Sequence, residues 1–254
     1  MPGAVSHDQR FLAAGHLSLD TDAVMSHAVA QGAADCLPGE PAGLPLVAPA
    51  LVYGASGEQV GFPGTVWIGH EEGLLGVLAE LVRLLALRVG RIVFVNGHGG
   101  YVTTLDTARG QLRGEGHDAA WTGCDVPGGD AHAGRTETSV MPHLAPDQVL
   151  LDAAVAGDTR PPAVLLPDLM ARRVRAVSPS GVLGDPSGAP LEEGRGMLDS
   201  MVSAAVGRIA GGVADGRGRL GSRPCSWRST VTNSRSARPT TRARPRGGSS
   251  ALGL

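Results

Sequence analysis

The sequence contains no lysine, and all 22 of its basic residues are arginine. Aromatic residues are scarce, at 3%, and the net charge is only -2, so the composition gives no overall reason to expect nucleic-acid or membrane binding. The cysteines are three, an odd number without metal-type spacing, which favours a reducing compartment. No apolar run reaches the length of a membrane span, and the N-terminus lacks a signal-peptide pattern. We therefore expect a cytoplasmic protein.

The 254 residues are enough for one α/β domain, which we place at residues 16–216. Residues 1–15 show no clean periodicity, although such a domain normally opens with an apolar strand. Residues 217–254 hold nine arginines and no acidic residue, with many Ser, Thr, Pro and Gly, which is typical of a disordered tail. Because the tail lacks interleaved aromatic residues, we do not expect it to bind nucleic acid. Residues 1–15 are a degraded or out-of-frame segment, and one hypothesis explains both ends together: frameshifts or a wrong start in the gene make them out-of-frame translation.

The hydrophobic pattern between these ends alternates between strands and helices. Residues 91–96 form a β-branched run that predicts a buried parallel strand, and residues 70–89 carry a broad apolar stripe that predicts a helix before it. The remaining expected elements are helices at 23–32, 103–113 and 191–210, and strands at 46–53, 119–123 and 174–177. The fold class that follows is α/β, with a central, mostly parallel sheet flanked by helices.

The strand at 91–96 ends on Asn-Gly-His-Gly-Gly, which makes His98 the first candidate site residue. Ligands of open α/β sheets collect beyond the carboxyl ends of the strands, and the glycines allow close approach to the backbone. The alternative is that His98 only hydrogen-bonds a turn. Asp22, near the start of the first expected helix, has two interpretations as well: a helix N-cap or a metal ligand.

A second group of polar residues lies at 128–139 and includes His132 and Glu137. These two are five residues apart, so a loop followed by a helix start is needed to bring them together. With Asp22 and His98 they form a mixed oxygen and nitrogen set that suits zinc, iron or manganese. A divalent ion lowers the pKa of a water to about 7, which makes it able to attack an amide. The set therefore predicts metal-assisted hydrolysis of a C–N bond.

Four motifs together resemble the creatininase family of amidohydrolases. They are His16 to Asp22, the Tyr-Gly-Ala-Ser-Gly-Glu and Phe-Pro-Gly-Thr segments at 53–58 and 62–65, Asn96 to Gly100, and Asp130 to Ser139. The Ser-Pro and Gly-Val-Leu-Gly-Asp-Pro segments at 178–186 make the chain most similar to the mycofactocin-system branch of that family. The resemblance runs from about residue 16 to residue 210.

The resemblance implies a creatininase-like layered fold, a homo-oligomer that is often a hexamer, and a site with one or two ions of Zn2+, Fe2+ or Mn2+. It implies that Asp22, His98 and Glu137 are metal ligands. The implied catalytic residues are His132, which passes a proton to the leaving amine, and Glu137. For the mycofactocin branch the substrate is a modified precursor peptide that loses a C-terminal Val-Tyr dipeptide.

Two other functions stay open. The first is hydrolysis of creatinine or a formamide by the same kind of site. The second is a metal-poor relic that binds the precursor peptide or assists assembly, and it is motivated by two departures from the family. Alignment on Asp22 puts Phe11 and Ala13 where the family has a Glu and a His ligand. In addition, Tyr101 replaces the usual Asn, and Gln59 stands where a His is common.

Overall fold

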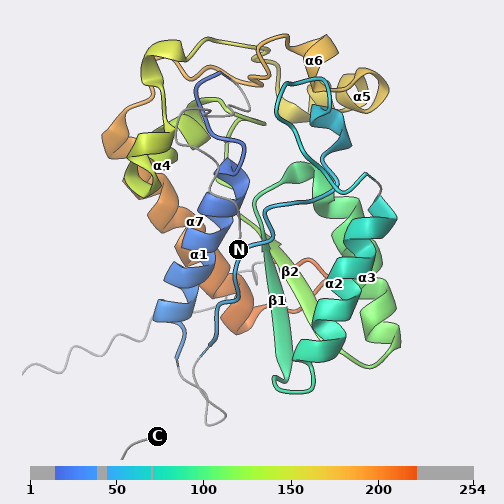
Figure 1. Ribbon diagram of the computed structural model, residues 1–254. Coiled ribbons are helices and arrows are strands. Elements are labelled where there is room, and N and C mark those ends of the chain that lie inside the picture. Colours follow the sequence, from blue (N-terminus) through green and yellow to red (C-terminus); the bar gives the residue numbers. More distant parts are fainter. Residues whose placement is uncertain (1–14, 39–44, 70, 222–254) are drawn as a thin grey trace, which may run out of the picture. The chain divides into compact units, whose positions relative to one another are not determined.

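The computed structural model describes residues 15–38, 45–69 and 71–221 of the chain. At its centre are two parallel strands, β1 (Arg91–Asn96) and β2 (Asp118–Gly123), paired in register from Arg91 with Asp118 to Asn96 with Gly123. Parallel neighbours need a long crossover, and α3 (Val102–Gly114) supplies it, reached through a short 3-10 turn at Gly99–Tyr101. Figure 1 shows the resulting β-α-β unit. The α/β class with a parallel sheet flanked by helices is confirmed.

Helices cover both faces of the two strands (Figure 1). On one face α2 (Glu71–Leu85) packs with α3, and on the other lie α1 (Thr21–Cys36), α4 (Arg135–Leu144) and α7 (Leu191–Gly211). The strand side chains alternate between two cores: Phe94 packs into the α2–α3 core, and Val95 packs against the α1–α4–α7 core. Because both faces are covered, β1 has the continuous apolar sequence of a buried parallel strand.

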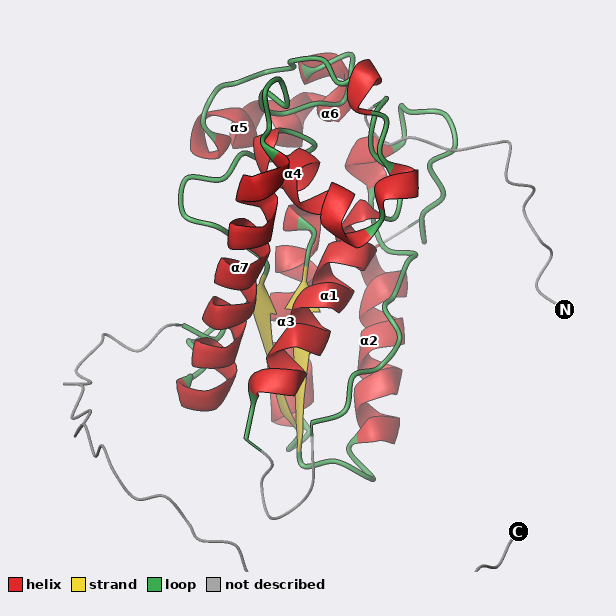
Figure 2. Ribbon diagram, turned by 90° about the vertical axis from the view of Figure 1, so that its left-hand side faces the viewer, coloured by secondary structure: helices red, strands yellow, loops and turns green. Residues whose placement is uncertain are grey.

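A third, smaller cluster packs beyond the end of the strands. It contains α5 (Pro162–Arg172) and the single turn α6 (Val174–Val177), as Figure 2 shows, and its buried residues are Leu165, Val174 and Leu183. Three further 3-10 turns lie at Gly57–Gln59, Pro146–Gln148 and Leu151–Ala153. Of these, the turn at Gly57–Gln59 matters most, because it belongs to the loop that approaches the end of β1.

Most expected elements are confirmed, but two expected strands are wrong. Residues 46–53 form neither helix nor strand: Pro49 has no N–H to donate, and Leu46 and Tyr53 are 84% and 59% exposed, so the segment buries too little to hold a sheet position. Residues 174–177 form α6, which begins after Arg173 at φ 64°. Residues 46–53, α2 and β1 therefore do not form a β-α-β unit, whereas β1, α3 and β2 do.

The folded part extends past the boundary expected at residue 216. Leu220 is 1% exposed, and its backbone N–H donates to the Trp121 carbonyl oxygen at 2.8 Å, so this segment runs beside β2. The expectations for residues 1–14, including Phe11 and Ala13, and for the tail from 222 to 254 lie outside the described residues. No helix in the described part of the chain is long and apolar enough to cross a membrane.

Candidate active site

His98 lies directly after β1, with its backbone held by Asn96. The Asn96 amide nitrogen donates to the His98 carbonyl at 2.9 Å, and the Asn96 Oδ1 accepts from the His98 N–H at 3.2 Å. The imidazole itself contacts two carboxylates. Its Nδ1 lies 2.8 Å from Asp22 Oδ2 and its Nε2 lies 2.6 Å from Glu58 Oε1. The alternative that His98 only hydrogen-bonds a turn is therefore wrong.

Asp22 belongs to the first turn of α1, but it does not cap the helix. The N-cap residue is Asp20, whose side chain makes no capping hydrogen bond, and the Asp22 carboxylate is directed to His98 instead. The close approach of α1 to the end of β1 depends on Gly97, because a Cβ there would lie 2.6 Å from the Asp22 carbonyl oxygen. The interpretation of Asp22 as a site residue is supported over the N-cap interpretation.

The charge on His98 follows from its two carboxylate neighbours. Burial lowers the pKa of the imidazole, but the hydrogen bonds and charges of Asp22 and Glu58 outweigh burial and raise the pKa of His98 to about 10. Burial raises the pKa values of Asp22 and Glu58, but hydrogen bonding to His98 outweighs it, so both pKa values are lowered overall. At neutral pH this part of the site is an imidazolium between two carboxylates.

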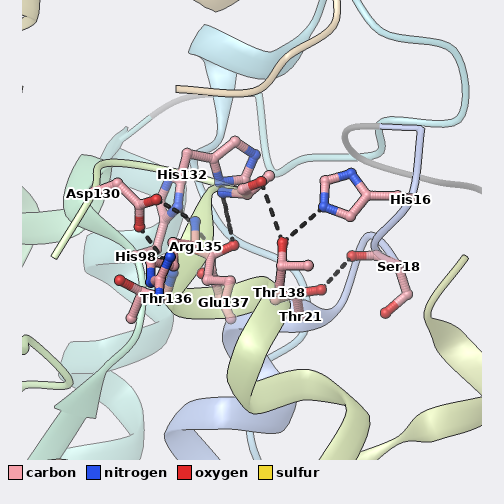
Figure 3. A network of polar contacts seen from close by, with 12 residues as sticks. His16, Ser18, Thr21, His98, Asp130, His132, Arg135, Thr136, Glu137 and Thr138 are labelled. Carbon is pink, nitrogen blue, oxygen red and sulfur yellow. Dashed lines mark hydrogen bonds and ion pairs between the residues drawn. The ribbon is translucent and has the colours of Figure 1, made fainter. Parts of the chain in front are cut away.

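His132 and Glu137 form a second buried pair beside His98. The chain turns into α4 through Ala133, at φ 51°, and the Asp130 carboxylate accepts from the N–H groups of Arg135 and Thr136 at the start of the helix. This turn brings the His132 and Glu137 side chains, both drawn in Figure 3, close to each other, and His132 Nδ1 lies 3.8 Å from Glu137 Oε2. The expected arrangement, a loop followed by a helix start, is confirmed.

Burial shifts the pKa values of both side chains toward their neutral forms. Burial, with the nearby charge of Asp22, raises the pKa of Glu137 to about 8, and its Oε2 accepts from the Ala133 N–H at 3.0 Å. Burial also lowers the pKa of His132. His132 is therefore neutral and Glu137 protonated at neutral pH. Within the described residues, His132 Nε2 is buried without a hydrogen-bond partner, which leaves this nitrogen available to a substrate.

The sequence analysis missed Glu58 as a site residue. Glu58 is part of the motif at 53–58, but no role was predicted for it. It lies in the turn at Gly57–Gln59, and it reaches a histidine 40 residues later in the chain. The only signal for it was the length of its loop, since long loops inside compact domains are usually functional. Gln59 showed the same signal but is not in this contact.

The fit of these side chains to a metal ion depends on their chemistry. Within the described residues, no three His, Cys, Asp or Glu side chains form a ready-made ion site. Asp22 and His98 are in contact, and they would offer a carboxylate oxygen and, once an ion displaces a proton from the imidazolium, an imidazole nitrogen, which are ligands that zinc, iron and manganese take. Glu137 makes no hydrogen bond or ion pair with Asp22 or His98 within the described residues, and its pKa is raised first by burial and then by the nearby charge of Asp22. The donor set therefore fits a divalent ion, with Asp22 and His98 as its assembled part.

The paired charges around His98 predict how the stability of the metal-free chain depends on pH. The pKa of His98 is raised from 6.5 to about 10 on folding, so its contribution is complete below pH 6.5 and is lost as pH rises through about 10. We expect the free energy of unfolding to fall across this window by up to about 1.4 kcal/mol per pH unit. Glu137 contributes a loss of the same sign that begins at lower pH, from 4.5 to about 8.

Urea unfolding of chelator-treated protein at pH 6 to 10.5 measures this slope. His98→Asn removes the His98 part of it, and His27→Asn, at an exposed position of α1, is the matched control that keeps the slope. Equal slopes for wild type and His98→Asn would show that the two carboxylates do not hold the proton on His98.

The chain is similar to known proteins of one family. The family model described as "Creatininase: Creatinine amidohydrolase" matches residues 14–209. A "Mycofactocin precursor peptide peptidase" of Mycobacterium ulcerans is 49% identical over 203 residues, covering 77% of this chain and 79% of that protein. A protein of the same description from Mycolicibacterium smegmatis is 48% identical, with 81% and 83% covered.

Solved structures agree with the sequence comparison. A creatinine amidohydrolase (creatininase) crystal structure is similar with a TM-score of 0.61 and 27% identity, covering 79% of this chain and 86% of that one. A structure described as "Creatininase Mn" is similar with a TM-score of 0.59 and 27% identity, covering 78% and 85%. Both the fold and the resemblance expected from the four motifs are confirmed.

Proposed function

Because the chain belongs to the creatininase family and is a hydrolase acting on C–N bonds, we propose that it is a peptidase that processes the mycofactocin precursor peptide. The observation that carries this proposal is the buried His132 and Glu137 pair beside Asp22 and His98, in a chain 49% identical to a peptidase of that description. The expected product is a C-terminal Val-Tyr dipeptide.

The metal-ligand part of the proposal assigns Asp22 and His98, with Glu137 as the neighbouring carboxylate. A divalent ion, when bound, polarises the scissile carbonyl and lowers the pKa of the attacking water. Support for such an ion comes from the donor set and from the manganese form of a related creatininase. Which ion the chain takes, Zn2+, Fe2+ or Mn2+, stays a prediction.

The proton transfers belong to His132. As a neutral imidazole with an unpartnered buried Nε2 among the described residues, it accepts a proton at Nε2 from the attacking water and returns it to the leaving amine nitrogen. Glu137 Oε2 lies 3.8 Å from the opposite ring nitrogen, so a Glu137 that has given up its proton would stabilise the imidazolium that forms. The burial of both side chains keeps bulk water from competing for this proton.

The alternatives differ in substrate and in metal content. Hydrolysis of creatinine or a formamide would use the same residues, but relatives with 48–49% identity favour the peptide. The relic alternative depends on Phe11 and Ala13, both outside the described residues. The homo-oligomeric state, the hexamer and the cytoplasmic location expected from the sequence stay predictions.

The proposal is tested with the full chain, loaded with Zn2+, Fe2+ or Mn2+, and the modified precursor peptide. We expect mass spectrometry to show release of a Val-Tyr dipeptide that stops when a chelator is added. A precursor ending in Tyr-Val, creatinine and formamide serve as control substrates. Turnover of creatinine or formamide without dipeptide release would support the amidohydrolase alternative, and binding of the precursor without cleavage under all three ions would support the relic.

A further inference from the structure

Glu58 and Asp22 divide the two nitrogens of His98 between them. Asp22 Oδ2 lies 2.8 Å from Nδ1, and Glu58 Oε1 lies 2.6 Å from Nε2, on the opposite edge of the ring. The side chains of His98 and Glu58 are 13% and 29% exposed, so this contact is largely removed from water. A histidine held on both sides in this way has no freedom to rotate or to exchange its two nitrogens.

The loop that carries Glu58 is fixed in place by contacts of its own. The Ser56 hydroxyl lies 2.8 Å from the Tyr101 hydroxyl, and the Tyr101 ring packs edge-on against the His98 ring with centroids 4.4 Å apart. The Thr65 hydroxyl donates to the Gln59 carbonyl at 3.1 Å, which closes the loop after Glu58. Glu58 is thus presented to His98 by an ordered segment.

Gly100 lies so close to the contact between His98 and Glu58 that a side chain at position 100 would collide with it. A Cβ at position 100 would lie 2.7 Å from His98 Nε2 and 3.2 Å from Glu58 Oε1. The glycine therefore leaves room for the Glu58 carboxylate to reach the ring, and it leaves no room for another side chain on that edge.

If Asp22 and His98 hold the ion, as the proposed function assigns, His98 would bind it through Nδ1, the nitrogen that faces the Asp22 carboxylate. Nε2 then carries the proton, and its acceptor is Glu58. Metal-binding histidines almost always donate their second N–H to such an acceptor, which fixes the tautomer and increases the basicity of the ligand nitrogen. We propose that Glu58 is the positioning residue that holds His98 with Nδ1 toward the ion, without being a ligand itself.

This role rests on the proposed function, because it requires an ion at Asp22 and His98. It is tested on the full chain by the Zn2+ dissociation constant, measured in competition with a chromophoric chelator, and by the visible absorption of the Co2+-loaded protein. The variants are Glu58→Ala, which removes the acceptor, and Glu58→Gln, which keeps an acceptor oxygen without the charge. Glu72→Gln, at an exposed position of α2, is the matched control.

We expect Glu58→Ala to weaken Zn2+ binding about 10- to 100-fold, Glu58→Gln to weaken it less, and Glu72→Gln to leave it unchanged. The Co2+ spectrum per bound ion should keep its intensity in both Glu58 variants, because no ligand is lost. If Glu58→Ala does not fold, the Glu58→Gln result alone decides, with a fall of at least about threefold expected.

Several outcomes would overturn the proposal. Zn2+ affinity within twofold of wild type in Glu58→Gln and Glu58→Ala would overturn the positioning role alone. A changed coordination spectrum in the Glu58 variants would make Glu58 a ligand. A wild-type chain that binds neither Zn2+ nor Co2+ would overturn the metal-dependent function as well, so the two failures are distinguishable.

Discussion

Replacing His98 by asparagine is expected to remove both ion binding and peptide hydrolysis. Among the described residues, His98 contacts both Asp22 and Glu58, so its loss takes away a proposed ligand and the link between the two carboxylates. The loss of ion affinity should exceed the roughly 10- to 100-fold effect of changing an outer-shell partner. Removal of the ion by a chelator should reduce the activity of the wild type to that of the variant.

The ion content is measured by elemental mass spectrometry of gel-filtered protein, and the activity by dipeptide release. His27→Asn, on the exposed side of α1, should keep both values at the wild-type level. A His98→Asn protein that retained its ion and its turnover would mean that the strand end does not hold the reaction centre.

Replacing His132 by asparagine should separate catalysis from ion binding. Removing a general acid and base typically costs about 100- to 10,000-fold in rate, and we expect a fall of this size in kcat. Within the described residues, His132 makes no hydrogen bond or ion pair with Asp22 or His98, so ion affinity should stay within a few-fold of wild type. The pairing of a large kcat effect with intact ion binding is the signature of a proton carrier.

The suitable control is His143→Asn, because His143 lies on the same helix, α4, and is exposed. The measurements are the Zn2+ dissociation constant and the kcat for dipeptide release. If His132→Asn lost the ion as completely as His98→Asn, His132 would be a ligand, and its assignment as the proton carrier would be wrong.

Sequence reasoning predicted those elements whose hydrophobic pattern is strong. β1 is apolar along its length because both of its faces are covered, and α2 buries one continuous stripe, so the hydrophobic pattern alone defines them. Residues 46–53 are just as apolar, yet Tyr53 is 59% exposed, and the residues that would pair with such a strand cannot be read from the segment itself. Whether residues 46–53 form a strand therefore depends on their tertiary contacts.

Some residues of the candidate site were predictable from the sequence, and one was not. His98 was predictable because its position after a strand has a general meaning in α/β folds, and the turn into α4 was predictable from the spacing of His132 and Glu137. Glu58 was not, because no local pattern links a loop carboxylate to a histidine 40 residues away. A polar side chain's partner is a property of the assembled fold, and local sequence has no information about it.

His98 and its two carboxylate partners come from segments far apart in the chain, and this has a consequence for folding. Asp22 and Glu58 precede His98 by 76 and 40 residues, and α1, which carries Asp22, packs against α7, the last helix. Closing such long loops costs chain entropy that only the finished packing repays. We therefore expect the cluster to form late in folding, once α1 and the loop of Glu58 have packed against the end of β1. If Asp22 and His98 hold the ion as proposed, ion capture would report that this packing is complete.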